Sequence, residues 1–315
     1  MLTRLKTLLP ALIGVFLLLA SLWVIHQELQ NYSAVEIWRN LTAIPQPQVQ
    51  RAIALTLLSL VVFTGYDTLA VLYIQHPLPY LKTALVAATS IPISNSVGFA
   101  LLSGSAIRYR FYADWGLSAL QITQAIAFCN LSFWLGLFVV GGILFVWQPI
   151  ALPSILHLPF ATTQPVGIVF LTVIAGYLLF NLLWRSGGRS LQDIRKQSFQ
   201  VPRLPIQLCL AQILVSSLDW TLAATVFYTL LPIPSPISFS AFFGIYLLAQ
   251  FAGVISSMPG GLGVFETVML LLLSQNVSSP VLFGLLLAYR AIYYLLPLGM
   301  AVTLLGSYEI YQRLR

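Results

Sequence analysis

The chain has 315 residues, of which 59% are hydrophobic and only 7% are charged, and its formal net charge is +7. A soluble domain carries about 25% charged residues, so this composition excludes a water-facing globule and indicates that the lipid bilayer is the solvent. The basic residues form no dense patch interleaved with aromatic residues, which argues against a nucleic-acid partner.

Apolar segments long enough to cross a bilayer as helices recur along the chain. Residues 10–25 follow Arg4 and Lys6, and because further apolar segments come later, we expect an uncleaved first helix and not a signal peptide. A polar segment follows at 26–50. The remaining full spans are expected at residues 52–74, 119–147, 165–184, 206–231 and 281–305, which makes six in all.

Two further apolar segments, residues 83–107 and 239–274, are interrupted by proline, glycine and small polar residues. Such residues break the hydrogen-bond ladder of a helix, and at membrane depth a break is tolerated only beside protein or a water-filled cavity. We therefore expect helical hairpins that enter and leave on one face. The break residues are Pro92, Ser94 and Gly98 in the first hairpin and Pro259, Gly260, Gly261 and Gly263 in the second.

The charge of the connecting loops supports this topology. The segment 184–203 carries five basic residues and one acid, so we expect it to be cytoplasmic, whereas the uncharged segments 148–164 and 232–238 should face outward. Only two hairpins, the first entering from the cytoplasm and the second from outside, place both termini and Lys82 in the cytoplasm. The chain is therefore predicted to be an integral membrane protein with both termini cytoplasmic.

The two halves then have the same order of elements, helix, helix, hairpin and helix, in opposite orientation. Asp67-Thr-Leu-Ala in one half resembles Asp219-Trp-Thr-Leu-Ala in the other. The predicted fold is an all-α polytopic membrane protein with six full spans and two re-entrant hairpins in an inverted-topology repeat. It is a single transmembrane domain over residues 1–315, with half-repeats at about 8–147 and 165–305 joined through 148–164. Paired breaks in corresponding positions of two halves indicate the binding site of a transporter.

Charged side chains inside the predicted spans are the candidates for chemistry, because an acid at the centre of a transmembrane helix costs about 2.5–3.5 kcal/mol. Asp67 and Asp219 either form a charged floor between the repeats or each pair with a buried tyrosine, threonine or arginine that fixes the bundle. Glu266 either contributes to the site or caps the helix that follows the second break. Arg290 needs a counter-charge, for which Glu266, Asp67 and Asp219 are the candidates. Arg108 and Arg110 either hold a lipid phosphate at headgroup depth or extend toward the interface and orient the chain.

No motif for catalysis, cofactor binding or metal binding accompanies these residues. Cys129 and Cys209 lie in apolar runs, the three histidines are scattered, and no metalloprotease, nucleotide-binding or serine-hydrolase pattern occurs. We therefore expect no enzyme activity, no cofactor and no metal ion.

Two blocks of sequence resemble a known family. Residues 94–98, followed by Gly104-Ser-Ala-Ile-Arg-Tyr-Arg-Phe-Tyr112, look like the first part of its signature, and Pro259-Gly-Gly-Leu-Gly-Val-Phe-Glu266 resembles the second. The pattern is similar to the transmembrane region of the lysylphosphatidylglycerol synthase/flippase family, and Asn95, which lies in the first block, joins the candidate site. Full-length members add a soluble aminoacyl-transferase domain. The sequence shows no such domain, so the resemblance implies a translocating region of the bacterial cytoplasmic (inner) membrane without aminoacylation.

The resulting prediction is a lipid transporter that moves a phospholipid or a lipid-linked headgroup across the membrane, with acids suited to a cationic or zwitterionic headgroup and arginines suited to its phosphate. Two alternatives stay open. One is an ion-coupled small-solute transporter in which Asp67 and Asp219 bind protons or sodium. The other is a non-transporting partner of a separately encoded glycosyltransferase or lipid-modifying enzyme. The partners expected are membrane lipids, with such an enzyme or a second copy of the chain left open.

Overall fold

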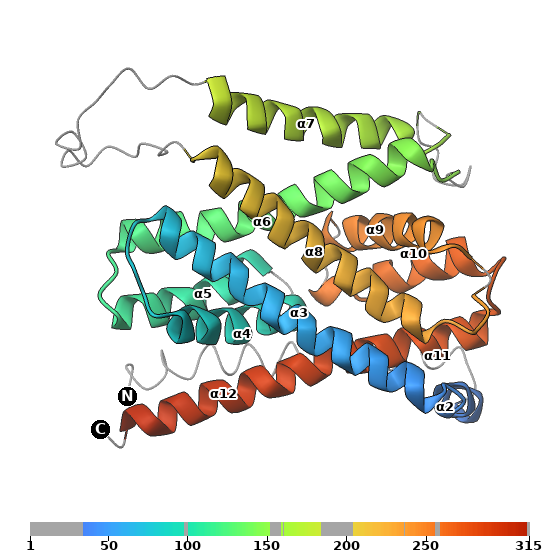
Figure 1. The fold of residues 1–315 in the computed structure, drawn as a ribbon. Helices are drawn as coiled ribbons and strands as arrows, with labels where there is room; N and C mark the ends of the chain where they lie inside the picture. Colours follow the sequence, from blue (N-terminus) through green and yellow to red (C-terminus); the bar gives the residue numbers. More distant parts are fainter. Residues whose placement is uncertain are drawn as a thin grey trace.

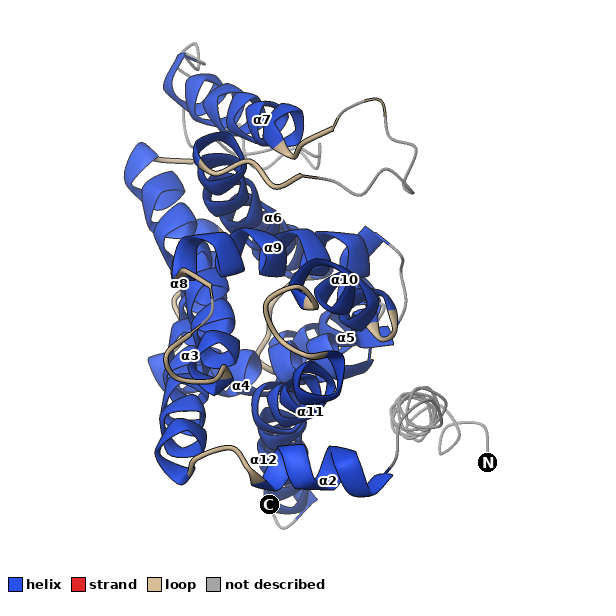
Figure 2. Ribbon diagram, turned by 90° about the vertical axis from the view of Figure 1, so that its right-hand side faces the viewer, coloured by secondary structure: helices blue, strands red, loops and turns tan. Residues whose placement is uncertain are grey.

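The structure is a computed structural model that describes residues 34–97, 100–151, 159, 161–183, 204–235, 237–255 and 259–313. The described residues are helical apart from short connections and an isolated bridge between Ala151 and Thr162 (Figure 2). The helices are α2 Ala34–Thr42, α3 Gln46–Tyr73, α4 Tyr80–Val97, α5 Ala100–Asp114, α6 Ala119–Trp147, α7 Gln164–Leu183, α8 Ile206–Leu230, α9 Phe239–Ile255, the 3₁₀ turn η3 Pro259–Gly261, α10 Val264–Leu273, α11 Ser279–Tyr289, the π-helical segment η4 Arg290–Leu295 and α12 Leu296–Arg313.

Five helices in the described part of the chain are long and apolar enough to cross a membrane. Four of them are α3, α6, α7 and α8, and the fifth runs continuously from Ser279 to Ile310 through η4. They correspond to five of the six predicted spans, and the sixth, at residues 10–25, lies outside the described residues. The protein is therefore an all-helical integral membrane protein.

The helices α3, α6 and α8 pack against one another at the centre of the bundle. Small residues permit this close approach: a methyl group added at Gly136 of α6 would lie 2.5 Å from the backbone of Ser216 in α8. In a bilayer, where apolar side chains gain little by leaving lipid, such close backbone contact is a main source of helix association. Helix α7 packs on α6 and lies at the edge of the bundle (Figure 2).

Two pairs of shorter helices complete the bundle. In the first hairpin α4 packs against α5, and in the second α9 packs against α10. Figure 1 shows the two hairpins at opposite ends of the molecule with their tips directed toward each other. The end of α12, the end of α7 and the start of α8 lie at the same end as the open side of the first hairpin, whereas α6 leads to α7 at the other end. Both hairpins thus bring a chain reversal into the interior of the bundle.

The breaks differ from one hairpin to the other. Gly260, Gly261 and Gly263 adopt positive φ angles of 58°, 64° and 79°, so the second hairpin is broken where the sequence predicted it. The break predicted at Pro92 and Ser94 is wrong, because α4 continues through both residues to Val97. A proline removes one hydrogen bond from the ladder and can bend a helix without ending it. The chain reversal comes after Val97, and Gly98 lies outside the described residues.

The segment 26–50, predicted as polar, contains a short helix and the start of α3. Helix α2 is strongly amphipathic and packs on α11, where Gly284 allows Asn40 to approach. Val35 and Trp38 on the same helix are 68% and 67% exposed. The helix ends before Pro45, and α3 begins at Gln46, six residues earlier than predicted. The apolar count alone could not locate this start, because Gln46 to Arg51 are mostly polar.

Candidate functional site

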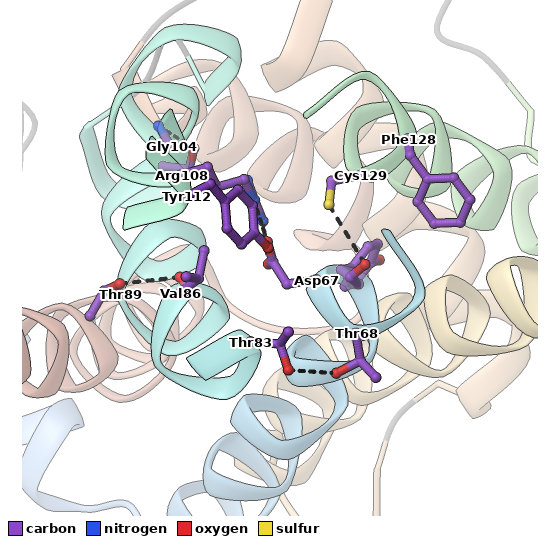
Figure 3. A network of polar contacts seen from close by, with 12 residues as sticks. Asp67, Thr68, Thr83, Val86, Thr89, Gly104, Arg108, Tyr112, Phe128 and Cys129 are labelled. Carbon is purple, nitrogen blue, oxygen red and sulfur yellow. Dashed lines mark hydrogen bonds and ion pairs between the residues drawn. The ribbon is translucent and has the colours of Figure 1, made fainter. Parts of the chain in front are cut away.

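The first buried charge pair joins α3 to α5. The guanidinium of Arg108 donates from Nε to Asp67 Oδ1 at 2.8 Å and from Nη2 to Oδ2 at 2.9 Å, and the Tyr112 hydroxyl donates to Oδ1 at 2.8 Å (Figure 3). Asp67 is fully buried and Arg108 is 5% exposed. A bidentate contact of this kind fixes both side chains and satisfies both carboxylate oxygens. Arg108 therefore holds the first hairpin to α3.

The second buried charge pair joins the second hairpin to the last span. Arg290 Nε donates to Glu266 Oε1 at 2.7 Å, and its Nη2 lies 2.6 Å from the same oxygen. The other carboxylate oxygen, Oε2, accepts the backbone N–H of Gly263 at 2.8 Å. Both of the roles considered for Glu266 are therefore present, since it is the counter-charge of Arg290 and also caps the start of α10.

The tips of the two hairpins meet next to this pair. Arg290 Nη1 donates to the carbonyl oxygen of Gly260 at 2.7 Å. A methyl group added at Gly260 would lie 3.3 Å from the carbonyl oxygen of Asn95, 3.5 Å from that of Ser96 and 3.4 Å from Arg290 Nη1. The glycine therefore allows the backbone of the second break to approach the end of α4. Arg290 lies where η3, α4 and the last span come together.

Asp219, in the middle of α8, has a different environment. Its Oδ2 accepts a hydrogen bond from the hydroxyl of Tyr66 at 2.8 Å, and Tyr293 also interacts with the carboxylate. Asp219 is 8% exposed. Within the described part of the chain, Asp67, Glu266 and Glu309 form ion pairs with arginines, and Asp219 forms none. It is a buried acid whose partners are phenols.

A group of buried hydroxyls extends from Asp219 toward Arg290. The hydroxyls of Tyr246 and Tyr289 lie 2.7 Å apart, and Gln250 Nε2 donates to Tyr246 at 2.7 Å and to Tyr294 at 3.1 Å. The guanidinium carbon of Arg290 lies 4.6 Å from the centre of the Tyr294 ring, within range of a cation–π contact. The π-helical segment η4 contains Arg290, Tyr293 and Tyr294, so one irregular turn supplies three residues of this group. Segments of π-helix occur frequently at functional sites.

The structure brings some predicted site residues together and separates others. Glu266 is the counter-charge of Arg290, and Asp67 and Asp219 pair elsewhere. The interfacial position expected for Arg108 is wrong because Asp67 holds its guanidinium inside the bundle. Arg110, on the opposite side of α5, forms an ion pair with Glu309 of α12, and its side chain is 50% exposed. Asp67, Asp219, Glu266 and Arg290 do not form one cluster. They are distributed over two ion pairs and one separate acid, and each of the three groups contacts a tyrosine.

Sequence reasoning allowed a buried tyrosine or arginine as the partner of Asp67 and Asp219, and the structure confirms this alternative, but the particular tyrosines were not identified. Tyr66 precedes Asp67, Tyr112 follows Arg108 by one helical turn, and Tyr289 and Tyr293 flank Arg290. A phenol inside an apolar span needs a hydrogen-bond partner, so tyrosines next to, or one turn from, intramembrane charges were an available signal. Among the described residues no group of histidine, cysteine, aspartate and glutamate side chains is placed to hold a metal ion.

Fold and site together define a polytopic helical membrane protein with ion pairs buried between broken and continuous helices. Residues 11–301 match the family described as the lysylphosphatidylglycerol synthase TM region, and the chain belongs to this family. An uncharacterized protein of Synechocystis sp. is 48% identical over 99% of this chain and 95% of its own length. The inner membrane protein YbhN of Escherichia coli is 30% identical over 85% of this chain and 82% of its own.

The family also includes larger proteins. A phosphatidylglycerol lysyltransferase of Staphylococcus haemolyticus is 25% identical over 78% of this chain, and the match spans 28% of that relative. The similarity to the lysyltransferase thus concerns a minor part of its length.

Proposed function

We propose that this protein moves a phospholipid or a lipid-linked headgroup across the membrane, and that the headgroup passes the point where the two hairpin tips meet. The observation that carries the proposal is the contact of Gly260 with the Asn95 carbonyl beside the guanidinium of Arg290. Discontinuous helices whose ends meet inside a membrane domain form the substrate sites of many transporters. The membership of a family that includes lipid-modifying enzymes supports a lipid as the substrate.

The chemistry of the tips suits a headgroup that carries both signs of charge. Arg290 offers a guanidinium to a phosphate, and Glu266 offers a carboxylate to an amine. In the present arrangement these two side chains satisfy each other. A zwitterionic headgroup can replace both partners at once, so that neither charge is left unpaired, whereas a ligand with one charge would strand the other. This exchange favours a zwitterionic or amine-bearing phospholipid over a simple anion.

The same proposal includes the finer topology. The two hairpins are re-entrant, the halves form an inverted repeat, and both termini face the cytoplasm. Support comes from the opposite directions of the hairpins in Figure 1 and from the five basic residues of the segment 184–203, which connects helix ends on the open side of the first hairpin. Lys82 and Arg110 belong to that hairpin. Rocking of one half against the other would then expose the tips to each side in turn.

We further propose that the chain acts without aminoacyl transfer, since the buried charged residues in the described part of the chain form ion pairs and phenol contacts and do not activate a nucleophile. The non-transporting alternative, in which the chain assists a separate lipid-modifying enzyme, is decided by the same experiment as transport.

The test is lipid translocation by purified protein in liposomes. Headgroup-labelled phosphatidylethanolamine and phosphatidylglycerol are placed in one leaflet, and their appearance in the other is measured by quenching. We expect transfer above that of protein-free liposomes, with the amine-bearing lipid preferred. Arg290→Met should reduce transfer at least tenfold, whereas Arg39→Gln, at an exposed arginine of α2, should not. Equal transfer with and without protein for both lipids would contradict the proposal and favour an assisting role.

A further inference from the structure

The four ionised groups at the core of the bundle form two neutral pairs, which leaves one acid to be explained. Arg108 neutralises Asp67 and Arg290 neutralises Glu266. Each arginine is thereby occupied, and neither forms an ion pair with Asp219. An isolated carboxylate in a low-dielectric interior is strongly disfavoured, because burying the charge costs more free energy than burying the neutral acid. Asp219 therefore needs a positive ligand of its own.

The surroundings of Asp219 select the ligand. Within the described residues the titratable side chains that interact with it are three phenols, Tyr66 of α3, Tyr293 of η4 and Tyr246 of α9. A sodium ion or another hard cation is held by several oxygen ligands, commonly carboxylates and carbonyls, and here a single carboxylate is available. A proton needs one oxygen.

The other helices that pack on α8 add no competing charge. Their titratable side chains are Cys129 of α6, whose thiol contacts the Tyr66 carbonyl at 3.7 Å, Tyr289 of α11, whose hydroxyl lies 2.7 Å from that of Tyr246, and Tyr177 of α7, which donates to Gln212 at 2.7 Å. Each has a partner other than Asp219. Among the carboxyl groups of the described core, Asp219 is therefore the one whose charge can change without breaking an ion pair.

We propose that Asp219 is a proton-binding site that takes one proton from one side of the membrane and releases it to the other. Binding forms one O–H bond on the carboxylate and removes its negative charge, and release restores the charge. Proton binding by Asp219 is inferred from the geometry around this residue alone. Release of the proton to the other side of the membrane, and its coupling to lipid movement, rest on the proposed function.

Two hydrogen bonds connect Asp219 to the elements that hold the hairpins. Tyr66 links Asp219 to α3 next to Asp67, which holds the first hairpin through Arg108. Tyr293 links it to η4, one turn from Arg290, which holds the second hairpin. A change of charge on Asp219 therefore acts on donors that belong to the two elements holding the hairpin tips.

The first arm of the test measures protonation directly. Infrared difference spectra of the reconstituted protein are recorded as the pH is lowered, and the carboxylic-acid C=O band is followed. We expect one band that Asp219→Asn removes and that Asp114→Asn, at an exposed acid of α5, leaves unchanged. Tyr66→Phe removes a hydrogen bond to the carboxyl group, so it should shift the band without abolishing it. If Asp219→Asn does not fold, the shift of the band in Tyr66→Phe identifies the band as that of Asp219. Absence of any band that responds to Tyr66→Phe or Asp219→Asn would overturn the proposal.

The second arm measures lipid transfer in liposomes under an imposed pH difference. We expect the rate in the wild type to respond to the gradient and the rate in Asp219→Asn to be independent of it. The two arms separate the hypotheses. A band that depends on Asp219, without lipid transfer, supports the proton site and refutes the transport function. Lipid transfer that is independent of the gradient, without such a band, supports the transport function and refutes the proton site.

Discussion

Removing the charge of Arg290 alone should destabilise the protein more than removing the charges of Arg290 and Glu266 together. Arg290→Met leaves a 7% exposed carboxylate with the Gly263 N–H as its remaining donor. Glu266→Gln leaves the buried guanidinium of Arg290 without its counter-charge, and the Gly260 carbonyl oxygen still accepts a hydrogen bond from it. Breaking a buried ion pair by removing one partner costs about 3–5 kcal/mol, so each single variant should lose that amount.

The double variant keeps no unpaired charge. Its main loss is the hydrogen bond from Arg290 to the Gly260 carbonyl, and an unsatisfied buried acceptor costs about 1–3 kcal/mol. The free energy of unfolding should therefore fall less in the double variant than in either single variant. The coupling energy of the cycle should be at least about 3 kcal/mol, at the upper end of the range found for residues in direct contact.

Reversible unfolding in mixed detergent micelles, followed by circular dichroism, gives the four free energies of the cycle. The matched control is the ion pair of Arg110 with Glu309, whose side chains are 50% and 30% exposed. An exposed pair contributes about 0–1 kcal/mol, so the cycle with Arg110→Gln and Glu309→Gln should be close to additive. Additive losses at Arg290 and Glu266 would refute the reasoning, because they would show that these two charges do not stabilise each other.

Three further predictions follow from the fold. A cysteine placed at Lys82 should react with an impermeant thiol reagent from the cytoplasmic side, and a cysteine placed within 232–238 should react from the outside. The background should be low because both native cysteines are buried. External labelling at Lys82 would contradict the first re-entrant hairpin. Gly260→Ala should lower stability by about 1–2 kcal/mol because its φ of 58° is left-handed, whereas Gly306→Ala, with no atom within 4 Å of the added methyl, should be neutral in the same melt. Purified protein given phosphatidylglycerol and lysyl-tRNA should form no lysyl-lipid by mass spectrometry, and detectable product would show an enzyme.

The composition of the chain was sufficient to predict the membrane class and most of the long helices. Spans such as α6 and α7 are predominantly apolar and carry no charged residue, and in a bilayer the hydrogen-bond requirement of the backbone leaves the helix as the only state for such a segment. The break at Gly260, Gly261 and Gly263 could also be predicted from the local sequence, because glycine readily adopts the positive φ angles found there. Pro92 was misleading, because a proline can either end a helix or lie inside one, and the neighbouring structure decides between these two outcomes.

The partners of the charges were decided by the tertiary structure alone. The sequence identified Asp67, Asp219, Glu266 and Arg290 as costly inside a membrane, but Coulomb attraction depends on distances between helices that are far apart in the chain. Packing of α5 on the bundle brings Arg108 to Asp67, and the π-helical turn of η4 brings Arg290 to Glu266 and to the second break. Among the described arginines none pairs with Asp219, for the same reason: the turn that places Arg290 at the hairpin tips leaves phenols facing α8.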